Sequence, residues 1–201
     1  MELHTYKRSV EEIIKRITDL TFSKDKIVIL IGGCARSGKT TLANELAAEL
    51  NNKQISSQII NLDGWLISKD QRPLNSKVYE RFDYTEIVNS LRLYLQGKGI
   101  KVYKYDIKSC SRIGEEELPS FTGKVVIIEG VIALDIPWLR ERADITIFKD
   151  INDDIRKQRL KEYFKNRSMD ETEKIKTIEE RELEEVPYIK ATKEYAQYIL
   201  K

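Results

Sequence analysis

The stretch Gly33-Cys34-Ala35-Arg36-Ser37-Gly38-Lys39-Thr40 constrains the fold more than any other part of this 201-residue sequence. It follows an apolar run at 27–31 and precedes a pattern typical of a helix at 41–50. Glycines permit a tight turn with converging backbone N–H groups, and the N-terminus of the following helix adds a positive dipole end. We therefore predict that a nucleoside triphosphate binds through Gly33, Cys34, Ala35, Arg36, Ser37, Gly38, Lys39, Thr40 and Thr41.

Two side chains of this loop have specific predicted roles. Lys39 is expected to reach the β- and γ-phosphates, and Thr40 is expected to ligate Mg²⁺. The alternative is a glycine-rich turn that binds no nucleotide. The apolar strand before the motif and the helix after it favour the phosphate-binding interpretation.

Composition narrows the class of protein. The length suits one α/β domain over residues 1–201, and 35 basic against 33 acidic residues leave no basic block that would indicate nucleic-acid binding. The longest apolar stretches are short or interrupted by Glu129 and Asp135, which argues against a membrane span. Two distant cysteines, Cys34 and Cys110, form no disulfide framework and indicate a reducing, cytoplasmic compartment. Whether the chain forms a homo-oligomer stays open.

Apolar runs at 58–62, 125–128 and 145–148 are predicted strands, and helical patterns separate them. This alternation predicts right-handed βαβ units and a parallel sheet with helices on both faces. Asp63 follows the first of these runs and Glu129 follows the second. Because ligands bind beyond the carboxyl ends of such strands, the loop, Asp63 and Glu129 are expected to meet in one crevice.

The remaining segments predict further elements. Ser9-Val10-Glu11-Glu12 has the capping-box pattern, which predicts a helix that begins at Ser9 and packs on the sheet. A second capping-box pattern begins at Asp83. Alternation at 101–106 predicts a strand, a polar stretch follows it as far as Pro119, and a short strand is expected at 197–200.

Several short motifs together resemble the uridine kinase and phosphoribulokinase family of P-loop kinases. They are the loop with Gly32 and Thr41, Leu62-Asp63-Gly64-Trp65, Phe82-Asp83, Tyr105-Asp106, Ile128-Glu129-Gly130, the arginines from Arg156 onward, and Thr192-Lys193-x-Tyr195-Ala196. The resemblance covers residues 26–201. It implies a P-loop NTPase fold with a five-stranded parallel sheet and a helical lid, and transfer of the γ-phosphate of ATP to a small-molecule hydroxyl.

The resemblance also assigns roles to single residues, each with an alternative. Asp63 would contact the acceptor hydroxyl and orient or deprotonate it, or belong to a simple Asp-Gly turn. Glu129 would hold Mg²⁺, or cap the next turn. Asp83 would hold sugar hydroxyls, although it also satisfies a helix cap. Tyr105 and Arg112 would line the acceptor pocket, or be a half-buried strand residue and a solvated loop residue.

The lid is expected within 152–185. Arg156, Arg159 and Arg167 would bind phosphate there, and Arg156 would also contact the acceptor. Such a charged segment is otherwise typical of a solvated helix face. Arg167 lies in Lys165-Asn166-Arg167-Ser168, where the family usually has Arg-Gly-Arg, and Arg36 stands where relatives have a small residue. Arg36 would either cover the phosphates or point to solvent.

Two other departures affect the expected specificity and packing. Cys110 falls where uridine kinases carry a histidine that reads the base, so uridine and cytidine are expected to be poor acceptors and a ribose-like compound or polyol a better one. Relatives continue beyond the last strand into a final helix. We expect the N-terminal extension, residues 1–22, to cover the sheet surface that such a helix would occupy.

The sequence therefore predicts an ATP- and Mg²⁺-dependent small-molecule kinase, a transferase with an alcohol group as acceptor. The alternative is an NTP-hydrolysing switch or ATPase that regulates a partner. The lack of an Asn-Lys-x-Asp guanine signature disfavours the GTPase form of that alternative. A kinase that has lost activity is disfavoured because Lys39, Thr40, Asp63 and Glu129 are all present.

Overall fold

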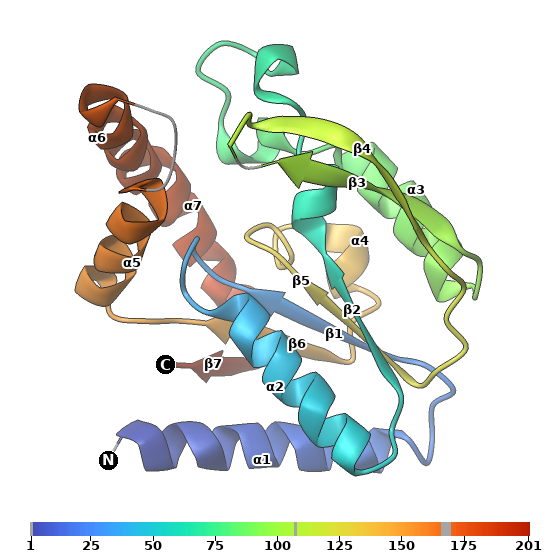
Figure 1. Cartoon of the computed structure of the whole chain (residues 1–201). Coiled ribbons are helices and arrows are strands. Elements are labelled where there is room, and N and C mark those ends of the chain that lie inside the picture. The colour runs from blue at the N-terminus through green and yellow to red at the C-terminus, as the bar shows by residue number, and fades with distance from the viewer. Residues whose placement is uncertain (1, 107, 166–169) are drawn as a thin grey trace.

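The structure is a computed structural model of the chain, and it describes residues 2–106, 108–165 and 170–201. Its centre is a five-stranded sheet in the order β2-β5-β1-β6-β7, and every neighbouring pair is parallel (Figure 1). The strands are β1 (Ile27–Gly32), β2 (Ser57–Asn61), β5 (Val125–Glu129), β6 (Ile145–Lys149) and β7 (Tyr198–Leu200). The predicted five-stranded parallel sheet with flanking helices is thereby confirmed.

Helices connect these strands and cover both faces of the sheet. The α-helices are α1 (Glu2–Leu20), α2 (Lys39–Asn52), α3 (Tyr84–Leu95), α4 (Pro137–Arg140), α5 (Asp153–Lys165), α6 (Glu171–Glu180) and α7 (Val186–Ala191). Short helical turns add η1 (Leu62–Trp65), η2 (Lys69–Gln71), η3 (Val78–Arg81), the π-helical η4 (Arg181–Glu185) and η5 (Thr192–Tyr195).

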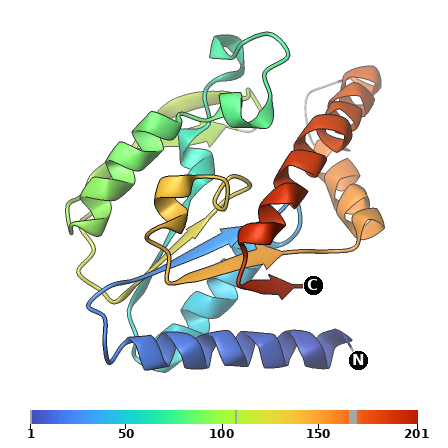
Figure 2. The same cartoon turned by 180° about the vertical axis from the view of Figure 1, so that it is seen from behind.

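Side chains of alternating strand residues form two separate cores. Ile27, Ile29 and Ile31 of β1 pack with α1 and α2 on one face. Val28 and Leu30 point to the other face, where η1, α3 and α7 pack. Figure 2 shows α1 running across the end of the molecule opposite α3 and the hairpin of β3 (Ile100–Asp106) and β4 (Ser111–Leu118). Burial on both faces explains why the central strands are almost continuously apolar.

Helix α1 begins earlier than its sequence pattern predicts. The helix already includes Glu2, and the Ser9 hydroxyl donates a hydrogen bond to the Thr5 carbonyl instead of capping a helix start. The prediction of a start at Ser9 is therefore wrong, because the residues before it continue the same helix. The helix buries Val10, Ile13 and Ile17 against the sheet and α2, so it packs on the sheet as predicted. That it takes the place of a final helix in relatives stays a prediction.

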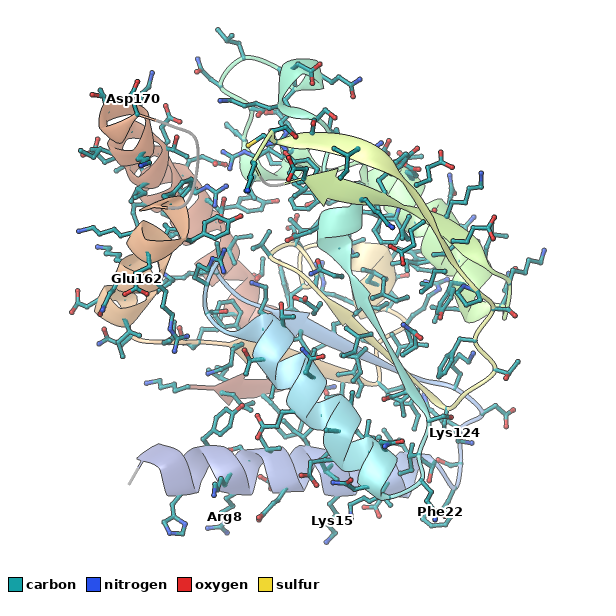
Figure 3. All side chains as sticks on the ribbon, in the orientation of Figure 1. Arg8, Lys15, Phe22, Lys124, Glu162 and Asp170 are labelled. Atoms are coloured by element: carbon teal, nitrogen blue, oxygen red, sulfur yellow. The ribbon has the colours of Figure 1, made fainter. Side chains whose placement is uncertain are left out.

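Replacing Ile17 with alanine is expected to lower the free energy of unfolding by about 2–5 kcal/mol. The Ile17 side chain is fully buried, so its removal leaves a cavity between α1 and the sheet. Lys15→Ala is the matched control, because Lys15 points away from the body of the protein on the same helix (Figure 3). Chemical denaturation should separate the two variants. Equal stability would show that α1 does not contribute to the core.

A two-stranded antiparallel hairpin stands apart from the main sheet. Strand β3 (Ile100–Asp106) includes the predicted strand, but the segment expected to be a polar stretch forms a second strand, β4 (Ser111–Leu118). That part of the prediction is incomplete because β4 has no apolar alternation. Its glutamates instead pair across the hairpin, Glu115 with Lys101 at 3.0 Å and Glu116 with Lys104 at 3.5 Å.

The region expected to form the lid contains α5, α6 and η4. Figure 1 shows α5 and α6 side by side on one flank of the sheet's upper edge, with the β3–β4 hairpin on the other flank. Arg167 lies outside the described residues. Within the part of the chain that is described, no helix is both long enough and apolar enough to cross a membrane.

Candidate active site

A cavity of about 1000 Å³ lies between the carboxyl ends of the strands, the β3–β4 hairpin and helix α5. Parts of the chain that are distant in sequence line it: the loop before α2 with the start of that helix, β2 with η1 and the segment after it, the hairpin, the end of β5, α5 and η4. Its position matches the rule that ligands bind beyond the carboxyl ends of parallel strands. The predicted convergence of the phosphate-binding loop, Asp63 and Glu129 is therefore seen in the fold.

The loop between β1 and α2 leaves the N-terminus of α2 open. Gly33 has a φ of 140° and Gly38 a φ of 98°, both in the region that favours glycine. A Cβ atom on Gly33 would lie 2.3 Å from the Lys149 carbonyl oxygen, so a side chain there would clash. No side chain caps α2, whose N-cap is Gly38. The N–H groups of its first turn are thus left for an anion.

The two loop residues with predicted phosphate and metal roles meet a carboxylate from β5. Lys39 is largely buried, and its ammonium group donates to the Cys34 carbonyl at 3.0 Å. The Thr40 hydroxyl donates to Glu129 Oε1 at 2.8 Å. Burial raises the pKa of Glu129, while Lys39 and the hydrogen bond from Thr40 act in the opposite direction. The site thus contains a cation, a hydroxyl and a carboxylate on one side of the cavity.

Asp63 lies at the start of the chain segment that follows β2. Its backbone N–H donates to Asn61 Oδ1 at 2.7 Å, which fixes the turn η1. The side chain opens to the cavity, but surrounding protein removes enough water to raise the pKa of its carboxyl. Lys39 and Arg181 lower that pKa in part. A carboxylate with a raised pKa beside a phosphate site is suited to accept a proton.

Two arginines lie at the phosphate-binding loop, one within the loop and one in helix α5. Arg36, within the loop, stacks on the ring of Tyr163 in α5, with Cζ 3.4 Å from the ring centroid. Arg159 of α5 places Nη1 3.9 Å from the position that a Cβ atom on Gly38 would occupy. Both arginines line the cavity. Helix α5 therefore contacts the loop directly, which is the position expected of a lid.

Arg156 is placed differently from the sequence-based expectation. Its guanidinium is buried, donates to both carboxylate oxygens of Glu182 at 2.6 Å and contacts Asp153 at 3.4 Å. It does not line the cavity, although Arg159 lies three residues further along the same helix. A phosphate role for Arg156 would require these ion pairs to break. In this structure Arg156 joins α5 to η4.

Two predicted acceptor-binding residues also lie outside the cavity lining. Asp83 accepts a hydrogen bond from the Glu86 N–H at 2.9 Å and caps α3. The Arg112 guanidinium stacks on Tyr103, donates to the carbonyls of Leu66 and Trp65, and lies 3.6 Å from the Glu86 carboxylate. Arg112 thus joins the hairpin to the segment after η1.

Tyr105 and Cys110 line the cavity at its hairpin end. The Tyr105 hydroxyl donates to the Cys110 carbonyl at 2.8 Å. Sequence reasoning missed three arginines that also line the cavity, namely Arg72, Arg81 and Arg181. No motif marks Arg72 or Arg81. Arg181 lies within the charged segment assigned to the lid, but nothing in that segment distinguishes it from its neighbours.

Comparison with known proteins gives the chain's relatives. The model of the phosphoribulokinase / uridine kinase family matches residues 28–201. Uridine-cytidine kinase B of Dictyostelium discoideum is 36% identical over 143 residues, which cover 68% of this chain and 58% of that protein. The uridine kinase of Leuconostoc citreum is 30% identical over 136 residues, which cover 65% of this chain and 64% of that protein. The matches thus span less than two thirds of either relative.

Solved structures share the fold at lower sequence identity. A candidate fructose transport system kinase from Silicibacter sp. TM1040 aligns with a TM-score of 0.75 at 17% identity, covering 96% of this chain and 98% of that chain. A possible uridine kinase from Bacillus stearothermophilus aligns with a TM-score of 0.61 at 22% identity, covering 94% and 100% respectively.

Proposed function

This chain belongs to the phosphoribulokinase / uridine kinase family, and we propose that it transfers the γ-phosphate of ATP to a hydroxyl of a small molecule. A nucleoside or a ribose-like compound is the acceptor class that the family suggests. One observation carries the proposal: the phosphate-binding loop and the Asp63 carboxylate line the same cavity, whose volume of about 1000 Å³ has room for both substrates.

The residues from Gly33 to Thr41 would hold the phosphates of ATP. Backbone N–H groups at the open end of α2 attract the anion, and Lys39 adds a positive charge at the point where the transferring oxygens gather negative charge. Arg159 and Arg36 would complete the phosphate contacts from the lid side. Phosphoryl transfer depends mainly on this positioning and charge compensation.

The donor set on the loop side fits Mg²⁺. Thr40 and Glu129 offer hard oxygen atoms already 2.8 Å apart, and these two residues would hold the ion. Within the described part of the chain no group of three or more His, Cys, Asp or Glu residues could hold a metal alone. This agrees with the preference of Mg²⁺ for one or two carboxylates together with substrate phosphates. When bound, the ion supplies charge neutralisation at those phosphates.

Asp63 would orient the acceptor hydroxyl and take its proton. Its raised pKa makes it a better base than an ordinary aspartate, and Lys39 and Arg181 still favour the charged form. The acceptor would then lie between Asp63 and the hairpin, since Asp63, Tyr103 and Tyr105 line the same cavity. Closure of α5 over this space would exclude water and limit hydrolysis of ATP.

The contact between Arg36 and Tyr163 gives a prediction about the lid. Tyr163→Leu removes the ring that supports the guanidinium, and a cation–π contact contributes about 1 kcal/mol at a partly exposed site. We expect the KM for ATP to rise about 3- to 10-fold with kcat nearly unchanged. Tyr163→Phe keeps the ring and should behave as the wild type. Equal KM values for the two variants would show that the stack does not help to bind ATP.

A screen of ATP consumption tests the proposed function. The protein and Mg²⁺-ATP would be combined with uridine, cytidine, ribose, ribose 5-phosphate, glycerol or glycerate, each with a control that lacks acceptor. A kinase should consume ATP slowly alone and much faster with at least one hydroxylated compound. Turnover that no small molecule accelerates would favour the NTP-hydrolysing switch.

A further inference from the structure

The basic residues that line the cavity can be grouped by their contacts. Arg36, Lys39 and Arg159 lie at the phosphate-binding loop. Arg81 and Arg181 share Glu185, at 3.2 and 3.9 Å, and Arg81 also pairs with Glu184 at 2.8 Å. Arg72 lies beside the hairpin, where it contacts Tyr105, and belongs to neither set.

Neutral groups hold Arg72 in place. Its Nε donates to the Ile67 carbonyl at 2.7 Å, and its Nη2 donates to the Tyr105 hydroxyl at 2.6 Å. The Tyr105 hydroxyl in turn donates a hydrogen bond to the Cys110 carbonyl, so this chain of hydrogen bonds reaches the backbone. These bonds use two of the five N–H donors of the guanidinium and fix its plane.

No carboxylate among the described residues pairs with Arg72. The side chain is half-buried, and the loss of hydration lowers its pKa, as does the positive charge of Arg81. An arginine stays protonated in proteins, so the protein holds a partly desolvated positive charge here. An oxyanion in the cavity would compensate that charge with bidentate geometry.

Arg112 shows what an arginine with a structural role looks like in the same region. It also donates to backbone carbonyls and contacts a tyrosine of β3, but it has the Glu86 carboxylate at 3.6 Å and lies outside the cavity lining. Arg72 has the same kind of anchors without a carboxylate, and it lines the cavity. An arginine that binds an anionic ligand needs both of these properties: access to the cavity and a positive charge that no carboxylate of the protein already neutralises.

We propose that Arg72 binds an oxyanion of the acceptor, a carboxylate or a phosphate ester, so that the preferred substrate is a hydroxylated anion and not a neutral nucleoside. The proposal rests on the proposed function, and it names the acceptor class for the same cavity. The acceptor's hydroxyl lies at Asp63 and its anionic group lies at Arg72. Turn η1, which carries Asp63, packs on β3, and Tyr105 of β3 holds Arg72, so both recognition points border the hairpin side of the cavity.

Matched neutral and anionic acceptors test the proposal. Steady-state kinetics would compare ribose with ribose 5-phosphate and glycerol with glycerate, which distinguishes phosphate from carboxylate recognition. Uridine is the neutral nucleoside. We expect kcat/KM for one anionic compound to exceed that of its neutral partner by about 100-fold or more. Comparable or higher kcat/KM for ribose, glycerol or uridine would overturn the proposal while supporting the kinase function.

Variants of the same loop complete the test. Arg72→Gln should lower kcat/KM for the anionic acceptor by about 100-fold, mainly through KM, and leave the neutral compound nearly unchanged. Lys69→Gln is the control, because Lys69 is exposed in η2 and does not line the cavity. An equal loss in both variants would contradict a specific role for Arg72.

Calorimetric titration with ribose 5-phosphate and glycerate gives a readout that does not depend on turnover. Binding that Arg72→Gln abolishes and Lys69→Gln retains would support the anion site even if no phosphoryl transfer occurred, in which case the kinase function would be wrong. Binding of neither anion to the wild type, with or without an ATP analogue, would overturn the anion site.

Discussion

Replacing Lys39 with alanine should lower the rate of phosphoryl transfer by at least about three orders of magnitude, equivalent to several kcal/mol in the transition state. The ammonium group is buried at the open end of α2, so no solvent cation can take its place with similar geometry. Transfer would be measured as acceptor-dependent ATP consumption at saturating Mg²⁺.

The variant should still fold, because the ammonium group makes one hydrogen bond, to the Cys34 carbonyl, among the described residues. Lys53→Ala is a suitable control, since Lys53 follows the far end of the same helix and is exposed. Turnover of Lys39→Ala close to that of Lys53→Ala would mean that this loop does not bind the transferring phosphate.

Asp63→Asn should reduce kcat by about two to four orders of magnitude while ATP affinity changes little. The amide has the shape of the carboxylate but cannot take the acceptor's proton. ATP affinity would be measured by titration without acceptor and kcat by steady-state kinetics. Asp70→Asn, an exposed position in η2, is the control. Loss of ATP binding would instead place Asp63 in the metal shell and make Glu129 the better candidate for the base.

The pH profile gives a second measure of Asp63. A base must be deprotonated to act, so kcat/KM should fall as the pH drops through the pKa of Asp63. Because burial raises that pKa, the fall should occur above the ordinary aspartate value of about 3.9. The fall should be absent from the residual activity of Asp63→Asn.

The sheet could be predicted because each central strand is marked by an apolar run within its own sequence. Strands buried on both faces, such as 27–31 and 125–128, are continuous apolar runs, and both runs are fully buried in the sheet. Strand β4 lacks such a signal. Its residues are largely exposed and its order comes from pairing with β3, so the partner strand and not the sequence pattern specifies it.

The site could be predicted where its residues follow strands. Asp63 and Glu129 take their positions from the ends of β2 and β5, which are adjacent in the sheet, so their sequence context already places them together. Arg156 and Arg159 lie on one charged helix. Their spacing along that helix does not reveal that Arg156 pairs with Glu182 while Arg159 lines the cavity. Arg72 lies in an irregular segment and reaches the cavity only through tertiary packing.

Phosphorus-31 NMR of a reaction with Mg²⁺-ATP and a hydroxylated acceptor tests the central claim most directly, because it follows where the γ-phosphate goes. Transfer to a hydroxyl predicts that a phosphate ester of the acceptor accumulates in step with ADP, with little inorganic phosphate. Appearance of inorganic phosphate in step with ADP, with no ester from any acceptor, would contradict the account.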